Sequence, residues 1–456
     1  VENLLTFDRT FGDHKVSALV GYTYQDSRYR YMQGSGQGMP TGITEIDAAS
    51  QGLAVSGNSS RSVLTSILGR AFYSYKNRYL LTATIRRDGS SKFGSNYRYG
   101  NFPSVSVGWN IAEEDFVKNS VSWLDQLKLR GGYGVLGNQE IDNYQYVSVV
   151  TTGINYPDGK SGLIQGAFPK TFANPDIKWE ETAMTNVGID FMALRNRLTL
   201  TADWYVKNTK DILLNVPIPI STGGANDPIR NAGKIRNQGF EFNLGWNESL
   251  NKDLSYGVSF LGTYNKNEVV EMGAESQVIT GGTIHGGTYT SRTLAGYPIG
   301  GFWLIPTDGY FNSTEEVQAH QKDGVLIQPS AEPGDIRFKD TNNDGTINDE
   351  DRVYCGSPFP KFTYSINGNI TYKNVDFSIG FQGVTGNKIY NATKLELTDV
   401  TRGTNYLAST LDYWTPENQN ASSPRLIWTD PNRNARSESD RYLESGSYFR
   451  LRNLQV

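Results

Sequence analysis

The sequence predicts an all-β protein: an antiparallel, up-and-down transmembrane β-barrel with long loops at one end. Three observations support this fold class. Apolar and polar residues alternate along many short segments, as they do along strands with one apolar face. The connections between these segments are alternately short and long. The 456-residue chain contains no run of eighteen apolar residues, yet 12% of it is aromatic, which suits the aromatic girdles of a membrane barrel.

The clearest alternation lies between residues 359 and 384. Apolar or aromatic residues occupy every second position, apart from a gap at 368, and the residues between them are small or polar; the apolar set is Phe362, Tyr364, Ile366, Ile370 and Tyr372. The pattern begins again after a tight turn at 373–374. Side chains alternate faces along a strand, so this stretch is predicted to be a β-hairpin with one apolar and one polar face.

The same design recurs along the chain and predicts about thirteen strands. In order they are expected near 2–10, 16–24, 63–75, 79–86, 104–111, 127–135, 187–191, 198–206, 240–246, 256–264, 362–372, 375–382 and 448–456. The apolar positions are rich in aromatic and β-branched residues, which fit a pleated surface.

The lengths of the connections carry further information. Odd-numbered connections are compact, and most even-numbered ones are long, with long loops near 25–61, 138–178, 210–234, 266–358 and 389–441. In an up-and-down sheet the odd and even connections lie at opposite ends. Short turns at one end and long extracellular loops at the other are typical of outer-membrane barrels.

Charged residues on the polar side of the strands leave two orientations open. These residues are Arg86, Lys128, Arg130, Asp190, Asp203, Glu241 and Asp376. A soluble sandwich would turn the apolar side toward a core, whereas a membrane barrel would turn it toward lipid. Thirteen successive strands exceed the roughly ten that an open sheet sustains, and a barrel removes exposed edges. Strand number and loop lengths therefore favour the barrel.

Composition excludes several classes of protein. The net charge is −4 and the pI about 5.6, so there is no basic field for nucleic acid. The single cysteine, Cys355, excludes a disulfide framework. The three histidines, His14, His285 and His320, are predicted to lie in loops without a second ligand at metal spacing. No pair of carboxylates faces a common cleft, so no catalytic residue is assigned and the chain is predicted not to be an enzyme.

The segment 340–351 (DTNNDGTINDED) has the spacing of a calcium-binding loop. Oxygen ligands stand at its first, third and fifth positions, glycine at the sixth, a residue that offers its carbonyl at the seventh, and a carboxylate at the twelfth. The predicted ligands of a structural Ca²⁺ ion are Asp340, Asn342, Asp344, Thr346 and Asp351. Asp351 replaces the usual glutamate, and no helical pattern flanks the loop. The alternative is a turn rich in Asn and Asp that binds no metal.

Tryptophans and tyrosines in the long loops could stack on sugar rings. The candidates are Trp179, Trp303, Tyr310, Trp414 and Trp428. Aromatic residues also anchor loops by burial, and burial is the expectation for each of them taken singly.

Seven segments resemble one family, the SusC/RagA-type TonB-dependent outer-membrane transporters of Bacteroidota. They occur in the family's order from about residue 100 onward and are FPSVSVGWNIAEEDF (102–116), LKLRGGYGVLGNQEIDNY (127–144), KWEETAMTNVGIDF (178–191), NQGFEFNLGW (237–246), PGDIRFKDTNNDGTINDEDR (333–352), PFPKFTYSINGNITYKNVDFSIGFQGVTGNKIYN (358–391) and SGSYFRLRNLQV (445–456). Together they are specific to the family.

The resemblance implies a 22-stranded barrel, of which residues 1–456 would form an internal and C-terminal part, truncated at both ends and without the plug domain. It implies a SusD-like surface lipoprotein as partner, contact with the TonB complex through the missing N-terminal region, and surrounding outer-membrane lipid. The aspartate-rich loop at 340–351 also belongs to the family's pattern. The expected location is the outer membrane of a Gram-negative, Bacteroidota-like bacterium.

The expected function is active import of oligosaccharides with the lipoprotein and TonB. One alternative is import of oligopeptides by the same kind of transporter. Another is a non-transporting, calcium-stabilised surface β-protein that binds glycans. No nucleic-acid partner is expected.

Overall fold

The computed structural model describes residues 1–159, 162–169, 171–216, 218, 221, 226–273, 278–284 and 287–456. Thirteen strands form one antiparallel sheet in chain order. They are β1 (Glu2–Phe11), β2 (His14–Gln37), β3 (Gln51–Tyr75), β4 (Tyr79–Ser90), β5 (Tyr99–Asn110), β6 (Leu124–Asn138), β9 (Glu180–Ala193), β10 (Leu198–Lys210), β13 (Lys234–Ser249), β14 (Leu254–Glu271), β23 (Phe362–Tyr372), β24 (Val375–Thr385) and β27 (Tyr448–Gln455). The predicted strands and their order are confirmed.

The alternation of short and long connections is also confirmed. The short ones include 12–13, 76–78, 194–197, 250–253 and 373–374, and the long ones include 139–179, 211–233, 272–361 and 386–447. Tight turns need left-handed backbone at one or more positions, and Lys76 and Asn77 have φ of 52° and 54°. Because every strand pairs antiparallel with the next in the chain, the two kinds of connection leave opposite ends of the strands.

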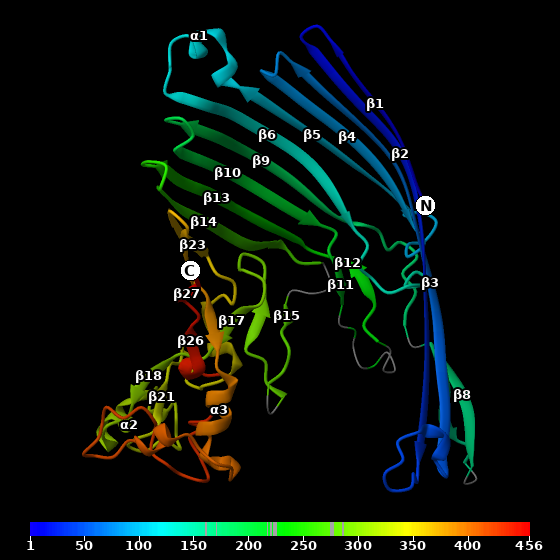
Figure 1. Ribbon diagram of the computed structural model, residues 1–456. Coiled ribbons are helices and arrows are strands. Elements are labelled where there is room, and N and C mark those ends of the chain that lie inside the picture. Colours follow the sequence, from blue (N-terminus) through cyan, green and yellow to red (C-terminus); the bar gives the residue numbers. More distant parts are fainter. Residues whose placement is uncertain are drawn as a thin grey trace. The chain divides into compact units, whose positions relative to one another are not determined.

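The first compact unit comprises Val1–Ala193, Tyr205–Lys234 and Gly273–Ser276. Its strands β1 to β6 and β9 run side by side (Figure 1). The alternation places one apolar residue after another on a single face, and these side chains are exposed: Val20 by 59%, Ile85 by 51% and Val107 by 55%. Across the strands, Leu81 stands opposite Val107, and Trp109 opposite Leu129. This apolar face is therefore not buried in a sandwich core within the described residues.

The second unit comprises Leu194–Trp204, Ile235–Met272 and Gln277–Val456. Its apolar face carries a ladder of stacked rings across β23, β24 and β27. The ring of Tyr364 lies 5.9 Å from that of Phe449, which lies 5.3 Å from Phe381. Gly383 stands between Tyr364 and Phe449 in the register, and a Cβ at this glycine would collide with the tyrosine ring. The glycine therefore makes room for the ladder.

Charged residues on the polar face pair with one another. Arg130 of β6 forms an ion pair of 2.9 Å with Asp190 of β9. Arg86 of β4 bonds Asp88 at 2.6 Å and the hydroxyl of Ser66 at 3.0 Å. The polar face is thus a charged and hydrogen-bonded surface that is compatible with water.

The loop predicted at 25–61 is instead largely strand. β2 and β3 stay paired from His14 opposite Tyr75 as far as Gln37 opposite Gln51. Only residues 38–50 connect them, with a 3-10 turn at Ile46–Ala48. The many glycines and serines of this segment obscured its alternation, and backbone pairing stabilises it despite their low strand propensity.

The other connections contain small elements. In the first unit these are α1 (Asp115–Lys118), β7 (Val150–Pro157), β8 (Leu163–Pro169), β11 (Leu213–Asn215) and β12 (Ile229–Asn231). In the second unit they are β15 (Ile279–Thr280), β16 (Ser291–Thr293), β17 (Gly301–Leu304), β18 (Thr307–Tyr310), α2 (Thr314–Ala319), β19 (Gln321–Lys322), β20 (Val325–Leu326), β21 (Ile336–Phe338), β22 (Val353–Gly356), β25 (Lys388–Tyr390), α3 (Ala392–Thr398) and β26 (Leu443–Ser445). No helix among the described residues is long and apolar enough to cross a membrane.

A small core in the first unit joins two of the connections between strands. Phe93, Ile177 and Trp179 pack there with Phe102 and Ile141. The rings of Phe93 and Trp179 lie 5.0 Å apart. Connections 91–98 and 139–179 are thus packed together by side chains that are far apart in the sequence.

Candidate metal centre and the loop assembly around it

The predicted calcium loop lies in a loop assembly that we define as residues 278–284, 287–358 and 386–446 of the second unit. Its two segments, before and after β23 and β24 in the chain, contain five large side chains that are almost fully buried: Leu304, Ile305, Phe311, Phe338 and Tyr442. Backbone bonds join the segments, from Ile305 N to Glu438 O at 2.8 Å and from Asp440 N to Ile305 O at 3.1 Å. No pattern in the sequence predicted this pairing.

A buried ion pair also joins the two segments. Asp335 is completely buried, and its carboxylate accepts from Nε of Arg425 at 2.7 Å and from Nη2 at 2.9 Å. Nδ2 of Asn434 donates to the same carboxylate at 2.7 Å. A buried charge needs such partners, because desolvation otherwise disfavours it strongly.

The calcium loop begins after β21 and ends in a 3-10 turn at Asp349–Asp351, just before β22. The strands β21 and β22 flank it, whereas the sequence predicts one long loop without a helical pattern there. Two residues of the loop have left-handed backbone: Asn343 with φ of 57° and Gly345 with φ of 91°. Glycine at the sixth position suits this sharp bend.

The structure brings four of the five predicted ligands together. Asp340 accepts from the backbone N–H groups of Asp344 at 3.1 Å and Gly345 at 2.8 Å. Asp344 accepts from Nδ2 of Asn342 at 3.0 Å and from the hydroxyl of Thr346 at 2.8 Å. These oxygen-bearing side chains therefore surround one turn.

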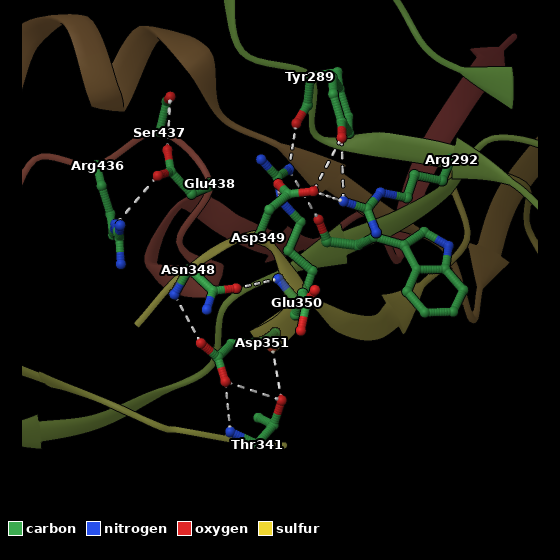
Figure 2. A network of polar contacts seen from close by, with 12 residues as sticks. Tyr289, Arg292, Thr341, Asn348, Asp349, Glu350, Asp351, Arg436, Ser437 and Glu438 are labelled. Carbon is green, nitrogen blue, oxygen red and sulfur yellow. Dashed lines mark hydrogen bonds and ion pairs between the residues drawn. The ribbon is translucent and has the colours of Figure 1, made fainter. Parts of the chain in front are cut away.

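Asp351, the fifth predicted ligand, has a different local role. It is completely buried, and its two oxygens accept from Thr341 N at 2.7 Å and from Asn348 N at 2.8 Å. Figure 2 shows the side chain of Asp351 between these two residues. Together with Asn348 it forms a capping box on the terminal turn. Asp351 thus links the start of the loop to its end.

Hydrogen bonds lower the pKa of Asp344 to about 2, first from the Thr346 hydroxyl and then from the Asn342 amide. The carboxylate therefore stays ionised over the whole physiological range. Oxygen atoms are the only metal ligands available from four of the predicted residues, namely Asp340, Asn342, Asp344 and Thr346. Ca²⁺ prefers oxygen ligands. Within the described residues, however, no three His, Cys, Asp or Glu side chains converge on one point as a metal site would require.

A cluster next to the loop was missed in the sequence. Asp349 pairs with Arg292 and, at 2.5 Å, with Nε of Arg352. The hydroxyl of Tyr289 donates to Asp349 at 3.1 Å (Figure 2). The guanidinium of Arg352 lies 4.7 Å from the Tyr289 ring centre. The cluster joins the calcium loop to the segment before β17. Its members are up to 63 positions apart and follow no period, so no sequence signal pointed to it.

The loop aromatics divide into buried and exposed residues. Trp179 and Trp414 are each 6% exposed, and Tyr310 packs on the core formed by Ile305, Ile336 and Phe338, as expected of loop anchors. Trp428 is 62% exposed. It borders an open hollow of about 480 Å³ with Tyr406, Leu407 and Leu411. Trp428 is thus available to a ligand in a way that the buried residues are not.

The remaining candidates have structural environments. His14 begins β2 rather than lying in a loop, and its Nδ1 lies 2.7 Å from the Tyr73 hydroxyl. Burial lowers the pKa of His320 at the end of α2, and His285 lies outside the described residues. Burial raises the pKa of the Cys355 thiol, which disfavours the reactive thiolate.

Residues 2–456 match the family described as TonB dependent receptor-like, beta-barrel. The chain belongs to this family.

Curated relatives of the receptor come from Bacteroidota. TonB-dependent receptor P3 of Formosa agariphila is 31% identical over 461 residues, which cover 99% of this chain and 44% of the relative. TonB-dependent receptor SusC of Bacteroides thetaiotaomicron is 33% identical over 340 residues, which cover 72% of this chain and 32% of SusC. The receptor chain thus spans less than half the length of these relatives.

A solved structure, that of the RagAB peptide transporter, has the same fold as the receptor chain. The TM-score is 0.83 at 23% identity, and the match covers 99% of this chain and 48% of the other. The predicted resemblance to SusC/RagA-type receptors and the predicted outer-membrane location are confirmed. The exposed apolar face of the receptor's sheet therefore faces lipid, and its charged face lies on the opposite, watery side.

Proposed function

We propose that the receptor imports oligosaccharides across the outer membrane with a SusD-like lipoprotein and energy supplied through TonB. The observation that carries this proposal is the two-faced sheet in a SusC-like chain. One face is apolar and exposed, while the other carries charge pairs such as Arg130–Asp190 at 2.9 Å. A hydrated wall of this kind can pass a polar solute through a membrane.

The exposed aromatic surface of the loop assembly favours glycans as the substrate class. Trp428 and Tyr406 are 62% and 39% exposed beside the same hollow. Flat rings can cover the apolar face of a sugar, while neighbouring polar groups bond its hydroxyls.

Oligopeptide import is the second candidate. The fold likeness to a protein named as a peptide transporter favours it, and the aliphatic part of the hollow, Leu407 and Leu411, would suit apolar side chains. A third candidate, a surface protein that binds glycan without transport, would bind the same ligands and take up none.

Growth of a strain lacking the receptor tests these candidates. The strain is grown on single glycans and on peptides, then complemented with the full-length receptor or with Trp428→Ala. Trp123→Ala is the matched control, because Trp123 is 53% exposed in the first unit. We expect loss of growth on one glycan class, restored by the receptor and by Trp123→Ala but only weakly by Trp428→Ala. A defect confined to peptides would replace the first candidate by the second.

The partners are tested separately. We expect a tagged receptor to co-purify with a lipoprotein encoded beside it, and uptake of labelled substrate to stop when TonB is deleted. Substrate binding that persists while uptake is absent even with TonB present would favour the third candidate.

We also propose that the loop at 340–351 binds a structural Ca²⁺ ion. The side chains of Asp340, Asn342 and Asp344 lie with Thr346 around one turn, and the Asp344 carboxylate remains ionised; both observations support the proposal. Titration calorimetry of the purified receptor with Ca²⁺ tests it. Binding should disappear in Asp344→Asn and persist in Asp323→Asn, an exposed aspartate in the neighbouring β19–β20 turn. Absence of binding heat in the unaltered receptor would leave the loop as a metal-free turn.

A further inference from the structure

The hairpin of β2 and β3 continues beyond the strands on either side of it. Pairing of β1 with β2 begins at Glu2 opposite Thr23, and pairing of β4 with β3 ends at Ser90 opposite Leu64. Residues 25–37 and 51–63 therefore form a ribbon of two strands, which Figure 1 shows running past β1 and β4. An isolated two-stranded ribbon is only marginally stable in water, so contacts on its faces matter.

The charges of this ribbon lie on one face only. The lipid-facing row of side chains contains Tyr22 of β2 and its cross-strand partner in β3. The charged residues of the ribbon continue this row on the same face: Asp26, Arg28, Arg30 and Arg61. On the opposite face the ribbon's own residues are uncharged, namely Gln25, Ser27, Tyr29, Tyr31, Gln33, Ser35, Ala54, Ser56, Asn58, Ser60, Ser62 and Leu64. Solubility alone would not require this separation.

Two of the arginines stand directly opposite each other. Arg28 pairs with Arg61 in the register, an arrangement that like-charge repulsion disfavours. Asp26 bridges them: its carboxylate lies 2.9 Å from Nε and Nη2 of Arg61 and 3.2 Å from Nη2 of Arg28. One carboxylate offsets one of three positive charges, because Arg30 follows on the same face. A net positive charge remains on a surface that is open to solvent, with Arg28 64% and Arg61 51% exposed.

The level of the cluster in the membrane identifies the class of anion. Tyr22 and Ile67, a cross-strand pair, are 45% and 59% exposed on the apolar face, and Asp26 follows four residues after Tyr22. Four residues of strand span about 13 Å. The cluster therefore begins about 13 Å beyond this exposed apolar pair, toward the long-connection end. Lipid headgroups lie at that level if the pair lies near the edge of the hydrocarbon.

We propose that Arg28, Arg30 and Arg61 bind the phosphate of a lipid headgroup in the leaflet at the long-connection end of the barrel. Guanidinium groups bond phosphate oxygens in a planar, two-pronged geometry. Asp26 holds two of these groups in place before the lipid arrives, which reduces the entropy lost on binding. The lipid would cover the ribbon's charged face and stabilise its base.

The test uses the full-length receptor in nanodiscs of phosphatidylethanolamine with a small fraction of phosphatidic acid. Lipid retained after mild detergent extraction is counted by native mass spectrometry. The variants are Arg28→Gln/Arg30→Gln/Arg61→Gln and the same three positions changed to Lys. Arg70→Gln is the matched control, because Arg70 is an exposed arginine on the opposite face of β3, bonded to Thr84 at 3.3 Å. A difference in gel mobility between the unheated and the heated sample shows that each variant is folded.

We expect the receptor and Arg70→Gln to retain phosphatidic acid. The triple Gln variant should retain at least about tenfold less of the lipid, because the loss of even one charge-assisted contact weakens binding by about that factor. The triple Lys variant should be intermediate, because it keeps charge without the planar fork. Equal retention by the triple Gln variant would overturn the proposal. Competition by inorganic phosphate or glycerol phosphate as effective as that by the lipid would identify a site for soluble anions instead. Loss of a co-purifying lipoprotein with unchanged lipid would make the face a protein contact and refute the lipid assignment.

Discussion

Replacing Asp351 by alanine should open the calcium loop even when no metal is present. The buried carboxylate accepts from Thr341 N at 2.7 Å and from Asn348 N at 2.8 Å. A hydrogen bond to a charged group contributes about 1.5–3 kcal/mol. With the lower value of this range for each bond, loss of both hydrogen bonds costs about 3 kcal/mol. This free energy corresponds to about a hundredfold increase in the fraction of molecules in which the loop is open.

Hydrogen exchange measured by mass spectrometry on residues 340–351 detects this opening in the purified receptor with a chelator present. Glu350→Gln is the control: the side chain is exposed, so we expect a change within about 0.5 kcal/mol. The reasoning fails if Asp351→Ala exchanges like the unaltered receptor under chelation and differs only with Ca²⁺ added. That result would make Asp351 a metal ligand rather than a clamp between the two ends of the loop.

Three further predictions concern packing, pH and the buried ion pair. Gly383→Ala should destabilise the receptor by about 1–3 kcal/mol by displacing a stacked ring. Gly368→Ala should be nearly neutral, because its Cβ would meet ordinary contacts at 3.4 Å. The temperature at which each variant changes to its unfolded gel mobility compares the two. Because its pKa is lowered from 3.8 to about 2, Asp344 contributes stability that is present above pH 3.8 and is lost as pH falls through about 2, so pepsin should cut the loop only near that lower limit. Arg425→Gln should cost about 3–5 kcal/mol and expose the loop assembly to trypsin, because it leaves the buried Asp335 without its cation; cleavage no faster than in the unaltered receptor would contradict this.

The sheet was predictable because its signal is local. Each strand repeats a period of two, and the connection lengths can be counted without any knowledge of pairing. The ribbon at 25–61 was missed because glycine and serine dilute the pattern there, although Arg28, Arg30 and Met32 alternate with Tyr29 and Tyr31.

The loop assembly was not predictable from local pattern. Asp335 and Arg425 are ninety positions apart, and neither belongs to a periodic segment. Asp351 illustrates a second limit of sequence-based prediction. An aspartate at the twelfth position of the loop can either bind Ca²⁺ or cap the terminal turn, and the sequence is the same in both cases. Only the positions of Thr341 N and Asn348 N show that its oxygens bond the backbone.

The two segments of the loop assembly lie on either side of β23 and β24 in the chain, yet buried hydrogen bonds and the Asp335–Arg425 pair join them. Exchange of one segment for that of a homologue would leave half of each contact without its counterpart. Chimeric receptors made to alter ligand preference should therefore carry both segments from the same donor. A graft of either segment alone is expected to fail through misfolding before its selectivity can be measured.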